Sequence, residues 1–402
     1  MNIRNNTPLN YRFFPDFDPV EFPEVRAICY EGQPLEGHRT EVFAYIGFPE
    51  NTSGPVPGVV LIHGGGGHAY GQWVAQWVRK GYAAIAMGNT GYFPNPQAPT
   101  GWSHGLWGPF VQNGTVSLPD NTGMTNGVNP EAESDWLYHA IGSASIARRI
   151  LAADPRVNPG EIGVMGISWG GVITSLLIGY DPSFAFAIPV YGSGYLTPEV
   201  TLGSISADFS HETVRERYLA EDRFSQVRTS VLWQCWNDDN NFSIQANSRS
   251  FLDTASSGLT VLSIVHDMFH SHRDAWKRPE PFIFADAVLD RGPAFPRLQA
   301  QPEGRSFCID LAWDHAFSAT IYYITTPMEY RVHNKYGRGA YLYMAQQWQT
   351  MPCQIKGTQI CGTLPDDVAG YYVEVKTRVA DKDFILSSVY VELFRTEVPQ
   401  NN

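Results

Sequence analysis

Several features typical of other protein classes are missing from this chain. No cluster of lysine or arginine occurs, and the net charge of its 402 residues is −12, so a polyanion such as nucleic acid would be repelled. No uninterrupted apolar stretch is long enough to cross a bilayer. The sequence therefore excludes nucleic acid and a membrane as expected partners. Because 43% of the residues are hydrophobic and 17% are charged, we expect a globular protein with a substantial core.

Cysteine is sparse, and no CxxC pair occurs. The five cysteines are Cys29, Cys235, Cys308, Cys353 and Cys361. An odd, scattered set suits a reducing compartment, although Cys353 and Cys361 would be placed to pair across a hairpin in an exported protein. The amino-terminal residues lack the apolar segment of a signal peptide. We therefore expect a cytoplasmic protein, and export after signal removal stays open as the alternative.

From about residue 40 to 290, short apolar runs alternate with longer amphipathic stretches. This alternation is typical of an α/β fold with a mostly parallel, doubly wound sheet covered by helices. The expected strands are 57–62, 82–87, 162–165, 185–190, 231–235 and 260–265. The expected helices are 69–80, 131–153, 244–254 and 279–289.

The carboxyl-terminal part has a different character. Residues 291–303 are rich in proline and predict a linker, and short β-rich runs follow at 320–324, 370–375 and 385–393. They predict a small antiparallel β-sandwich of the immunoglobulin-like type. We therefore expect two domains, a catalytic domain over 1–292 and an accessory domain over 303–397.

Residues 88–130 lack periodicity and are rich in Gly, Pro, Asn and Trp. A long irregular segment in a compact domain is usually functional, as a lid or binding loop. Its aromatic residues would line a substrate pocket and stack on sugar rings, or alternatively only anchor the loop. The pocket candidates are Tyr92, Trp102, His104 and Trp107, together with His272 from a later loop.

The motif Gly166-Ile167-Ser168-Trp169-Gly170 lies between an expected strand and an expected helix. That context is the one a GxSxG nucleophile elbow requires, because small residues let the turn tighten and expose the serine oxygen. The helix amino terminus favours developing negative charge. The motif predicts Ser168 as a nucleophile.

Four glycines follow His63 at the end of the first central strand. Glycine lets backbone N–H groups approach a ligand closely, and such a loop supplies an oxyanion donor together with the residue after the nucleophile. We assign Gly65 and Trp169 as the donors, with Gly64 as the alternative in the loop. A P-loop is excluded because no GK[ST] follows, and a dinucleotide fingerprint lacks its third glycine.

The acid and base are expected after later strands. Asp238 and Asp239 end the strand at 231–235; Asp239 is the preferred acid, Asp238 stays open, and both would also suit a plain turn. His270 is the expected base, because the order Ser168, Asp239, His270 is that of α/β-hydrolases. A metal site formed by His266, Asp267, His270 and His272 is the competing interpretation.

Several segments together resemble acetyl xylan esterase-like enzymes, bacterial α/β-hydrolases grouped with dienelactone hydrolases and prolyl oligopeptidase-type enzymes. The resemblance covers roughly residues 38–290 and, more loosely, the β-rich tail. It rests on residues 40–45, 63–67, 81–87, 166–171, 189–192, 268–272 and 284–289. Two features depart from the pattern: Trp236 stands where relatives usually have Gly, and the strand-end motif Met87-Gly88-Asn89-Thr90 lacks the Asp that relatives often have after the Met.

The resemblance implies a serine carboxylesterase that removes O-acetyl groups from a carbohydrate through Ser168, Asp239 and His270. No cofactor or metal is expected, and the partner would be a small-molecule or oligosaccharide ester, with self-association left open. The alternatives are a peptidase of the prolyl oligopeptidase type and a non-enzymatic binding protein built on a hydrolase scaffold.

Overall fold

The computed structural model describes residues 9–90, 92–94, 107–109, 115–116, 131–197, 204–239, 241–255, 258–326, 328, 330–333, 340–343 and 347–393. By its internal contacts the chain divides into two compact units, Met1–Gly192 with Ser210–Ser230 and Ser193–Phe209 with Val231–Asn402. This division reflects contact density, and the predicted domain bounds of 1–292 and 303–397 stay a prediction.

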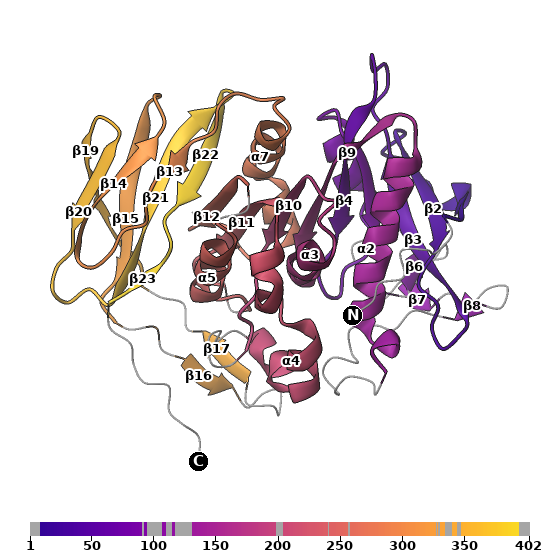
Figure 1. Ribbon diagram of the computed structural model, residues 1–402, viewed down its shortest axis with the longest axis horizontal. Coiled ribbons are helices and arrows are strands. Elements are labelled where there is room, and N and C mark those ends of the chain that lie inside the picture. Colours follow the sequence, from indigo (N-terminus) through magenta and orange to yellow (C-terminus); the bar gives the residue numbers. More distant parts are fainter. Residues whose placement is uncertain are drawn as a thin grey trace. The chain divides into compact units, whose positions relative to one another are not determined.

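The first unit contains a mostly parallel sheet with strand order β1-β2-β3-β5-β4-β9-β10 (Figure 1). Strands β5, β4, β9 and β10 are parallel, whereas β1, β2 and β3 form an antiparallel edge. The strands are β1 (Tyr11–Phe13), β2 (Val25–Glu31), β3 (Arg39–Gly47), β4 (Val56–Ile62), β5 (Ala83–Met87), β9 (Val157–Ile167) and β10 (Phe186–Val190). The helices are α1 (Gly71–Val78), α2 (Trp136–Ala153), α3 (Trp169–Tyr180) and α4 (Glu212–Tyr218).

Helices cover both faces of this sheet, as the apolar run in β4 predicts. A Cβ on Gly47 would lie 2.9 Å from Val74 of α1, and one on Gly58 would lie 3.3 Å from Leu151 of α2. Gly47 aligns through β5 with Val59, the neighbour of Gly58 in β4. Because successive residues of a strand face opposite sides, α1 and α2 lie on opposite faces. The α/β class and the double winding are confirmed.

The second unit contains two parallel strands, β11 (Ser230–Trp236) and β12 (Thr260–Val265), which pair in register from Val231 with Thr260 to Trp236 with Val265. Helix α5 (Ile244–Thr254) connects them, and Ser243 caps its start by accepting a hydrogen bond from the Ala246 amide. Helices α6 (His272–Trp276) and α7 (Glu280–Val288) follow.

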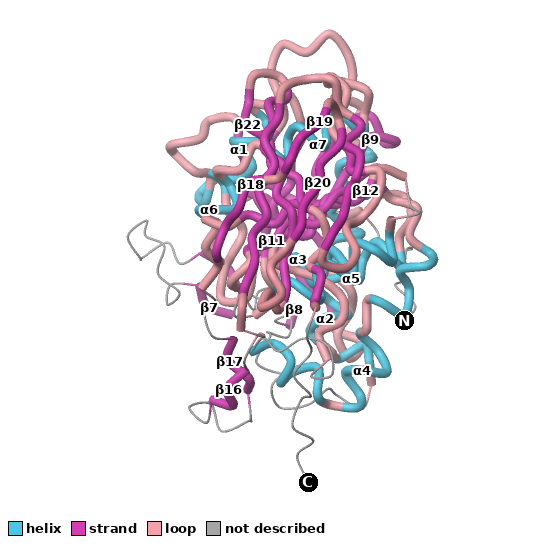
Figure 2. The backbone as a smooth tube through the Cα atoms, turned by 90° about the vertical axis from the view of Figure 1, so that its left-hand side faces the viewer, coloured by secondary structure: helices cyan, strands magenta, loops and turns pink. Residues whose placement is uncertain are grey.

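The rest of the second unit is antiparallel β-structure. One sheet has the order β13-β14-β20-β19 and the other β18-β15-β21-β22, with β23 beside β21 (Figure 1). Figure 2 shows the same β-structure after a 90° turn, with β18, β19, β20 and β22 labelled. Phe307 of β14 stacks on Tyr371 of β21 with ring centroids 5.6 Å apart, so the two sheets pack face to face. The strands are β13 (Arg297–Leu298), β14 (Ser306–Ala312), β15 (Phe317–Ile324), β16 (Tyr330–His333), β17 (Ala340–Tyr343), β18 (Gln349–Pro352), β19 (Gln354–Lys356), β20 (Gln359–Thr363), β21 (Gly370–Val379), β22 (Lys382–Ser387) and β23 (Val391–Glu392).

Strand β22 lies against the edge strand β12 and is held there by polar side chains. The Ser387 hydroxyl accepts a hydrogen bond from the Ile264 amide at 3.0 Å. The buried carboxylate of Glu280 accepts one from the Ile385 amide at 3.1 Å and pairs with Arg278. Since a buried unpaired carboxylate is costly, these contacts fix β22 on the helix-bearing part of the unit.

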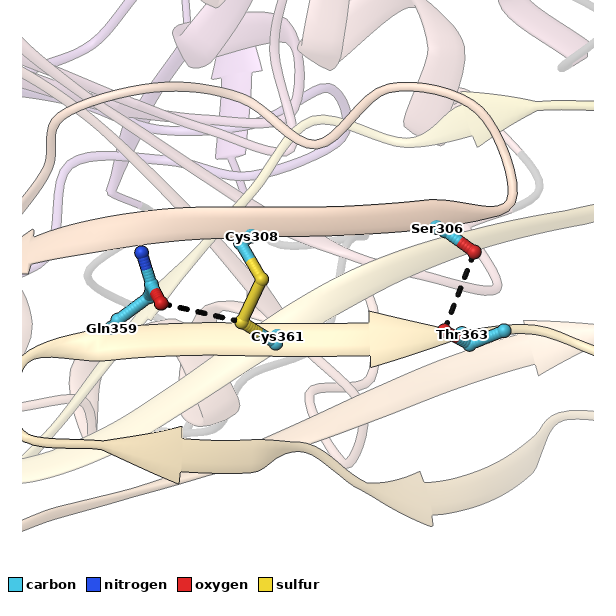
Figure 3. Close-up of a disulfide and its surroundings, with 5 residues drawn as sticks. All are labelled: Ser306, Cys308, Gln359, Cys361 and Thr363. Carbon is cyan, nitrogen blue, oxygen red and sulfur yellow. Dashed lines mark hydrogen bonds between the residues drawn. A yellow bond between two sulfur atoms is a disulfide. The ribbon is translucent and has the colours of Figure 1, made fainter.

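Cys308 and Cys361 form a disulfide between directly opposed residues of β14 and β20 (Figure 3). The pairing of Cys361 with Cys353, which the sequence leaves open for an exported protein, does not form, because strand register places Cys308 opposite Cys361. Cys353 is a free, half-buried thiol, and burial raises its pKa to about 12. Cys29 and Cys235 are free and buried.

Other expectations need local correction. The expected linker contains β13, which pairs with β14. The irregular segment contains a short antiparallel ribbon of β6 (Tyr92–Pro94) with β7 (Trp107–Pro109), and β8 (Thr115–Val116) pairs with β3. The run 385–393 is interrupted between β22 and β23. Over the part of the chain that the structure describes, no helix is long and apolar enough to cross a membrane.

Candidate active site

Ser168 forms the turn between β9 and α3 and has a strained backbone. Its φ is 58° and its ψ is −121°, a conformation that costs energy for a residue with a Cβ. The surroundings hold it: the Ser168 amide donates to Val190 O at 2.8 Å, and its carbonyl accepts from the Val172 amide at 3.0 Å. The serine is half-buried at the amino terminus of α3. This is the geometry of a nucleophile elbow.

The two predicted oxyanion segments, Trp169 and the glycine loop, are neighbours. A Cβ on Gly170 would overlap the carbonyl oxygens of Ile62 and His63, so only glycine lets α3 begin this close to the end of β4. In the loop, Gly66 has a φ of 66°, and the Gly67 amide donates to Gly64 O at 3.1 Å. Gly65 lies exposed at the tip of this turn and Gly64 is buried.

A buried hydrogen-bond network fixes the glycine loop. His63 Nδ1 donates to Gly64 O at 2.7 Å, and its Nε2 accepts from the Asn89 amide at 3.1 Å. The Asn89 side chain donates back to His63 O at 2.7 Å, and Trp136 Nε1 donates to Asn89 O at 2.5 Å. The Trp136 ring then meets the Trp169 ring edge to face at 5.2 Å. One chain of contacts thus connects both oxyanion segments.

The start of α2 is itself anchored. The buried carboxylate of Asp135 accepts hydrogen bonds from Arg217 Nη1 and the Tyr218 hydroxyl of α4, each at 2.8 Å. His139, one turn further along α2, is buried, and this burial lowers its pKa. A neutral, buried histidine indicates a structural role in the core.

The structure brings two of the predicted catalytic residues together, Asp239 and His270, both in the second unit. His270 Nδ1 donates to Asp239 Oδ2 at 2.7 Å, and the imidazole stacks on Phe242 with ring centroids 5.9 Å apart. Asp239 is buried, and its other oxygen accepts from the amides of Asn241 and Phe242 at 2.7 and 3.1 Å. This arrangement orients the imidazole and leaves Nε2 as the proton acceptor. Ser168 belongs to the first unit.

Asp238, the alternative acid, is directed elsewhere: its Oδ1 accepts from Trp348 Nε1 at 2.9 Å. Among the histidines of the competing metal site, His266 Nδ1 accepts from Asn237 Nδ2 at 3.0 Å, and the His272 ring lies 5.8 Å from that of Trp276. Within the described ranges, no group of three or more His, Cys, Asp or Glu side chains is placed to hold a metal ion.

The predicted substrate pocket is only partly described. Trp102 and His104 lie outside the described residues, and Tyr92 and Trp107 are placed only as backbone in the β6–β7 ribbon. Close to His270 in sequence, the Phe269 side chain is 63% exposed, and its ring lies 5.4 Å from that of Trp236. The pocket assignments stay predictions.

Sequence reasoning missed His63, Asn89 and Trp348 as residues that support the site. His63 opens the glycine motif, and Asn89 lies in the strand-end motif that departs from the family pattern, so the sequence carries a signal for both. Trp136 is expected from the sequence only as a core residue or as support for a loop, and its contact with Asn89 spans 47 residues. The sequence offers no signal for Trp348, whose contact with Asp238 spans 110 residues.

No protein-family model and no curated protein matches the sequence. Among solved structures, an acetyl xylan esterase from Paenibacillus sp. R4 is 18% identical, with a TM-score of 0.47 over 70% of this chain and 90% of that one. Acetyl xylan esterase 1 from Thermoanaerobacterium sp. JW/SL YS485 is 14% identical, with a TM-score of 0.43 over 66% and 84%.

A Pyrococcus horikoshii acylaminoacyl peptidase is 15% identical, with a TM-score of 0.46, and the match covers 71% of this chain but only 42% of that chain's length. Structural similarities with such low identities and TM-scores support no conclusion about activity. The strand order of the first unit, the parallel β11–β12 pair and the serine-bearing turn between β9 and α3 give the chain the α/β-hydrolase fold.

Proposed function

We propose that the protein is a serine carboxylesterase that removes acetyl groups from the hydroxyls of a carbohydrate. The observation that carries this proposal is the strained Ser168 at the β9–α3 turn, in a chain that also holds a hydrogen-bonded Asp239–His270 pair whose carboxylate is buried. A strained non-glycine residue persists only where its surroundings impose it, and such residues concentrate at active sites.

In the proposed reaction, His270 Nε2 takes the proton of Ser168 as the serine oxygen attacks the ester carbonyl. Asp239 holds the imidazole in the tautomer with Nδ1 protonated and stabilises the imidazolium. The amides of Gly65 and Trp169 stabilise the oxyanion, and loss of one such donor typically costs about 3 kcal/mol. His270 then protonates the leaving alcohol, and a water activated by His270 releases acetate from the acyl-enzyme.

The neighbouring thiol does not compete as the nucleophile. Cys235 lies in β11 just before the acid-bearing turn, and burial raises its pKa well above the ordinary value. A buried, protonated thiol is inert. This leaves Ser168 as the proposed nucleophile.

The decisive experiment compares hydrolysis of p-nitrophenyl acetate and p-nitrophenyl butyrate by the wild type, Ser168→Ala and His270→Ala. We expect acetate turnover by the wild type and loss of at least about 10³-fold in both variants. Acetate release from acetylated xylo-oligosaccharides then tests the carbohydrate, with Ser168→Ala as the control.

The alternatives give different results. Cleavage of an acyl-p-nitroanilide in preference to the ester would indicate the peptidase. Activity that survives in Ser168→Ala and is abolished by a chelator would indicate metal-dependent chemistry. A folded wild type that is inert toward all of these substrates would favour the non-enzymatic scaffold.

A further inference from the structure

The turn that carries the proposed acid is held by a separate partner at each residue. Asn237 donates to His266 at 3.0 Å, Asp238 accepts from Trp348 at 2.9 Å, and Asp239 accepts from His270 at 2.7 Å. His266 and His270 both come from the loop after β12. The partner of Asp238 is different, because Trp348 lies just before β18 in the carboxyl-terminal β-structure.

The Trp348 ring packs against two tyrosines. It packs edge to face on Tyr372 at 5.3 Å and on Tyr390 at 6.3 Å. Tyr372 is buried and stacks on Tyr322 at 5.1 Å, and Tyr322 lies 5.1 Å from the His266 ring. The same aromatic cluster therefore supports both loops, through Trp348 on one side and Tyr322 on the other.

Two adjacent carboxylates, Asp238 and Asp239, follow β11, and the contact with Trp348 bears on which of them faces His270. Asp238 and Asp239 carry the same chemical group, and either is able to accept from an imidazole N–H. An indole N–H donates but never accepts, so Trp348 directs one carboxylate to itself. The other carboxylate is then the one that faces His270.

We propose that Trp348 is a positioning residue of the active site: its indole N–H holds Asp238 and thereby fixes Asp239 on His270. The carboxyl-terminal β-structure is then part of the machinery that orients the acid. This inference rests on the proposed function only for its kinetic readout, because the Asp239–His270 hydrogen bond is also observable by NMR.

The test compares Trp348→Phe with Trp313→Phe in the full-length protein. Trp348→Phe keeps the ring contacts and removes the donor. Trp313 Nε1 donates to Thr377 Oγ1 at 2.7 Å, so Trp313→Phe removes another indole hydrogen bond of the same β-structure, one that does not reach the acid loop. We expect kcat for p-nitrophenyl acetate to fall about tenfold in Trp348→Phe with KM within about twofold, and Trp313→Phe to match the wild type.

Two further measurements separate positioning from general destabilisation. The downfield proton signal of His270 Nδ1–H, assigned by its absence in Asp239→Asn, is expected to broaden or vanish in Trp348→Phe and to persist in Trp313→Phe. Asp238→Ala removes the acceptor of the indole N–H, so its kcat is expected to fall about as far as that of Trp348→Phe.

The proposal is overturned if Trp348→Phe retains both kcat and the downfield signal, or if both tryptophan variants lose them equally. If the wild type has no esterase activity, the proposed function fails, and the NMR comparison still decides the role of Trp348.

Discussion

The two halves of the proposed site are built by different means. The nucleophile half is made by backbone: Ser168 is held by amide and carbonyl contacts, and Gly170 lets α3 begin against β4. The acid–base half is made by side chains, in which Asp239, His270 and Trp348 come from separate loops. The close approach of α3 to β4 in the nucleophile half depends on the absence of a Cβ at Gly170, and the acid–base half depends on particular side-chain donors and acceptors. Substitutions should therefore damage the two halves in different ways.

The largest loss of activity is expected from a change at Asp239, which accepts the hydrogen bond from His270. Asp239→Asn should leave the fold intact and lower kcat about 10⁴-fold, because the amide favours the wrong imidazole tautomer. Steady-state kinetics with p-nitrophenyl acetate measures this, and Asp238→Asn is the matched control. Comparable losses in both variants would contradict the choice of Asp239.

The next largest effect is a loss of stability when a side chain is added at Gly170 in the nucleophile half. Gly170→Ala places a Cβ on the carbonyl oxygens of Ile62 and His63, so the unfolding free energy should drop by more than about 3 kcal/mol. Urea denaturation followed by circular dichroism measures this. Gly160→Ala, whose Cβ would meet only the Asn158 side chain at 3.6 Å, should change stability by less than about 1 kcal/mol. Equal stability of the two variants would contradict the requirement for glycine at the close approach of α3 to β4.

A third prediction concerns the cross-link within the carboxyl-terminal β-structure. Cys308→Ser opens a link between residues 53 positions apart, which should lower the free energy of unfolding by about 2 to 4 kcal/mol. Thermal denaturation with and without a reductant measures this, and the reductant should have no further effect on the variant. Cys353→Ser is the control, and its melting temperature should be nearly that of the wild type.

The smallest effect is expected in the network behind the glycine loop. Trp136→Phe keeps the ring against Trp169 and removes the hydrogen bond to Asn89 O, so kcat should fall about tenfold. Tyr30→Phe removes a comparable buried hydrogen bond to Ser143 O and should lower only stability, by about 1 kcal/mol. An unchanged kcat in Trp136→Phe would show that the loop holds its shape without this donor.

The difference between the halves also explains what the sequence predicts. Ser168 and its glycines are consecutive, and the strain and close approaches they produce follow from local chain geometry. Helix α5 and strand β12 were predicted at their observed bounds, because their periodicity and caps are equally local. The choice between Asp238 and Asp239 stays open in the sequence, because the contact that engages Asp238 comes from a tryptophan 110 residues away.

The disulfide has the same explanation. Cys361 is nearer in sequence to Cys353, but its partner is set by the register of β14 with β20, which no local pattern encodes. Likewise, the sequence gives no indication that the Glu280 carboxylate receives the Ile385 amide. Contacts between side chains that lie far apart in the sequence are therefore the part of the structure that the sequence does not predict.

Because Asp238 and Trp348 lie 110 residues apart, they are synthesised at different times. A ribosome adding about 5–20 residues per second needs roughly 6–20 s to travel from one to the other. During that interval the nascent chain already contains Ser168 and its glycine-rich turn but lacks the indole that holds the acid loop. If Trp348 positions Asp239 as proposed, a chain synthesised only as far as residue 347 contains the proposed nucleophile, acid and base but not the donor that orients the acid.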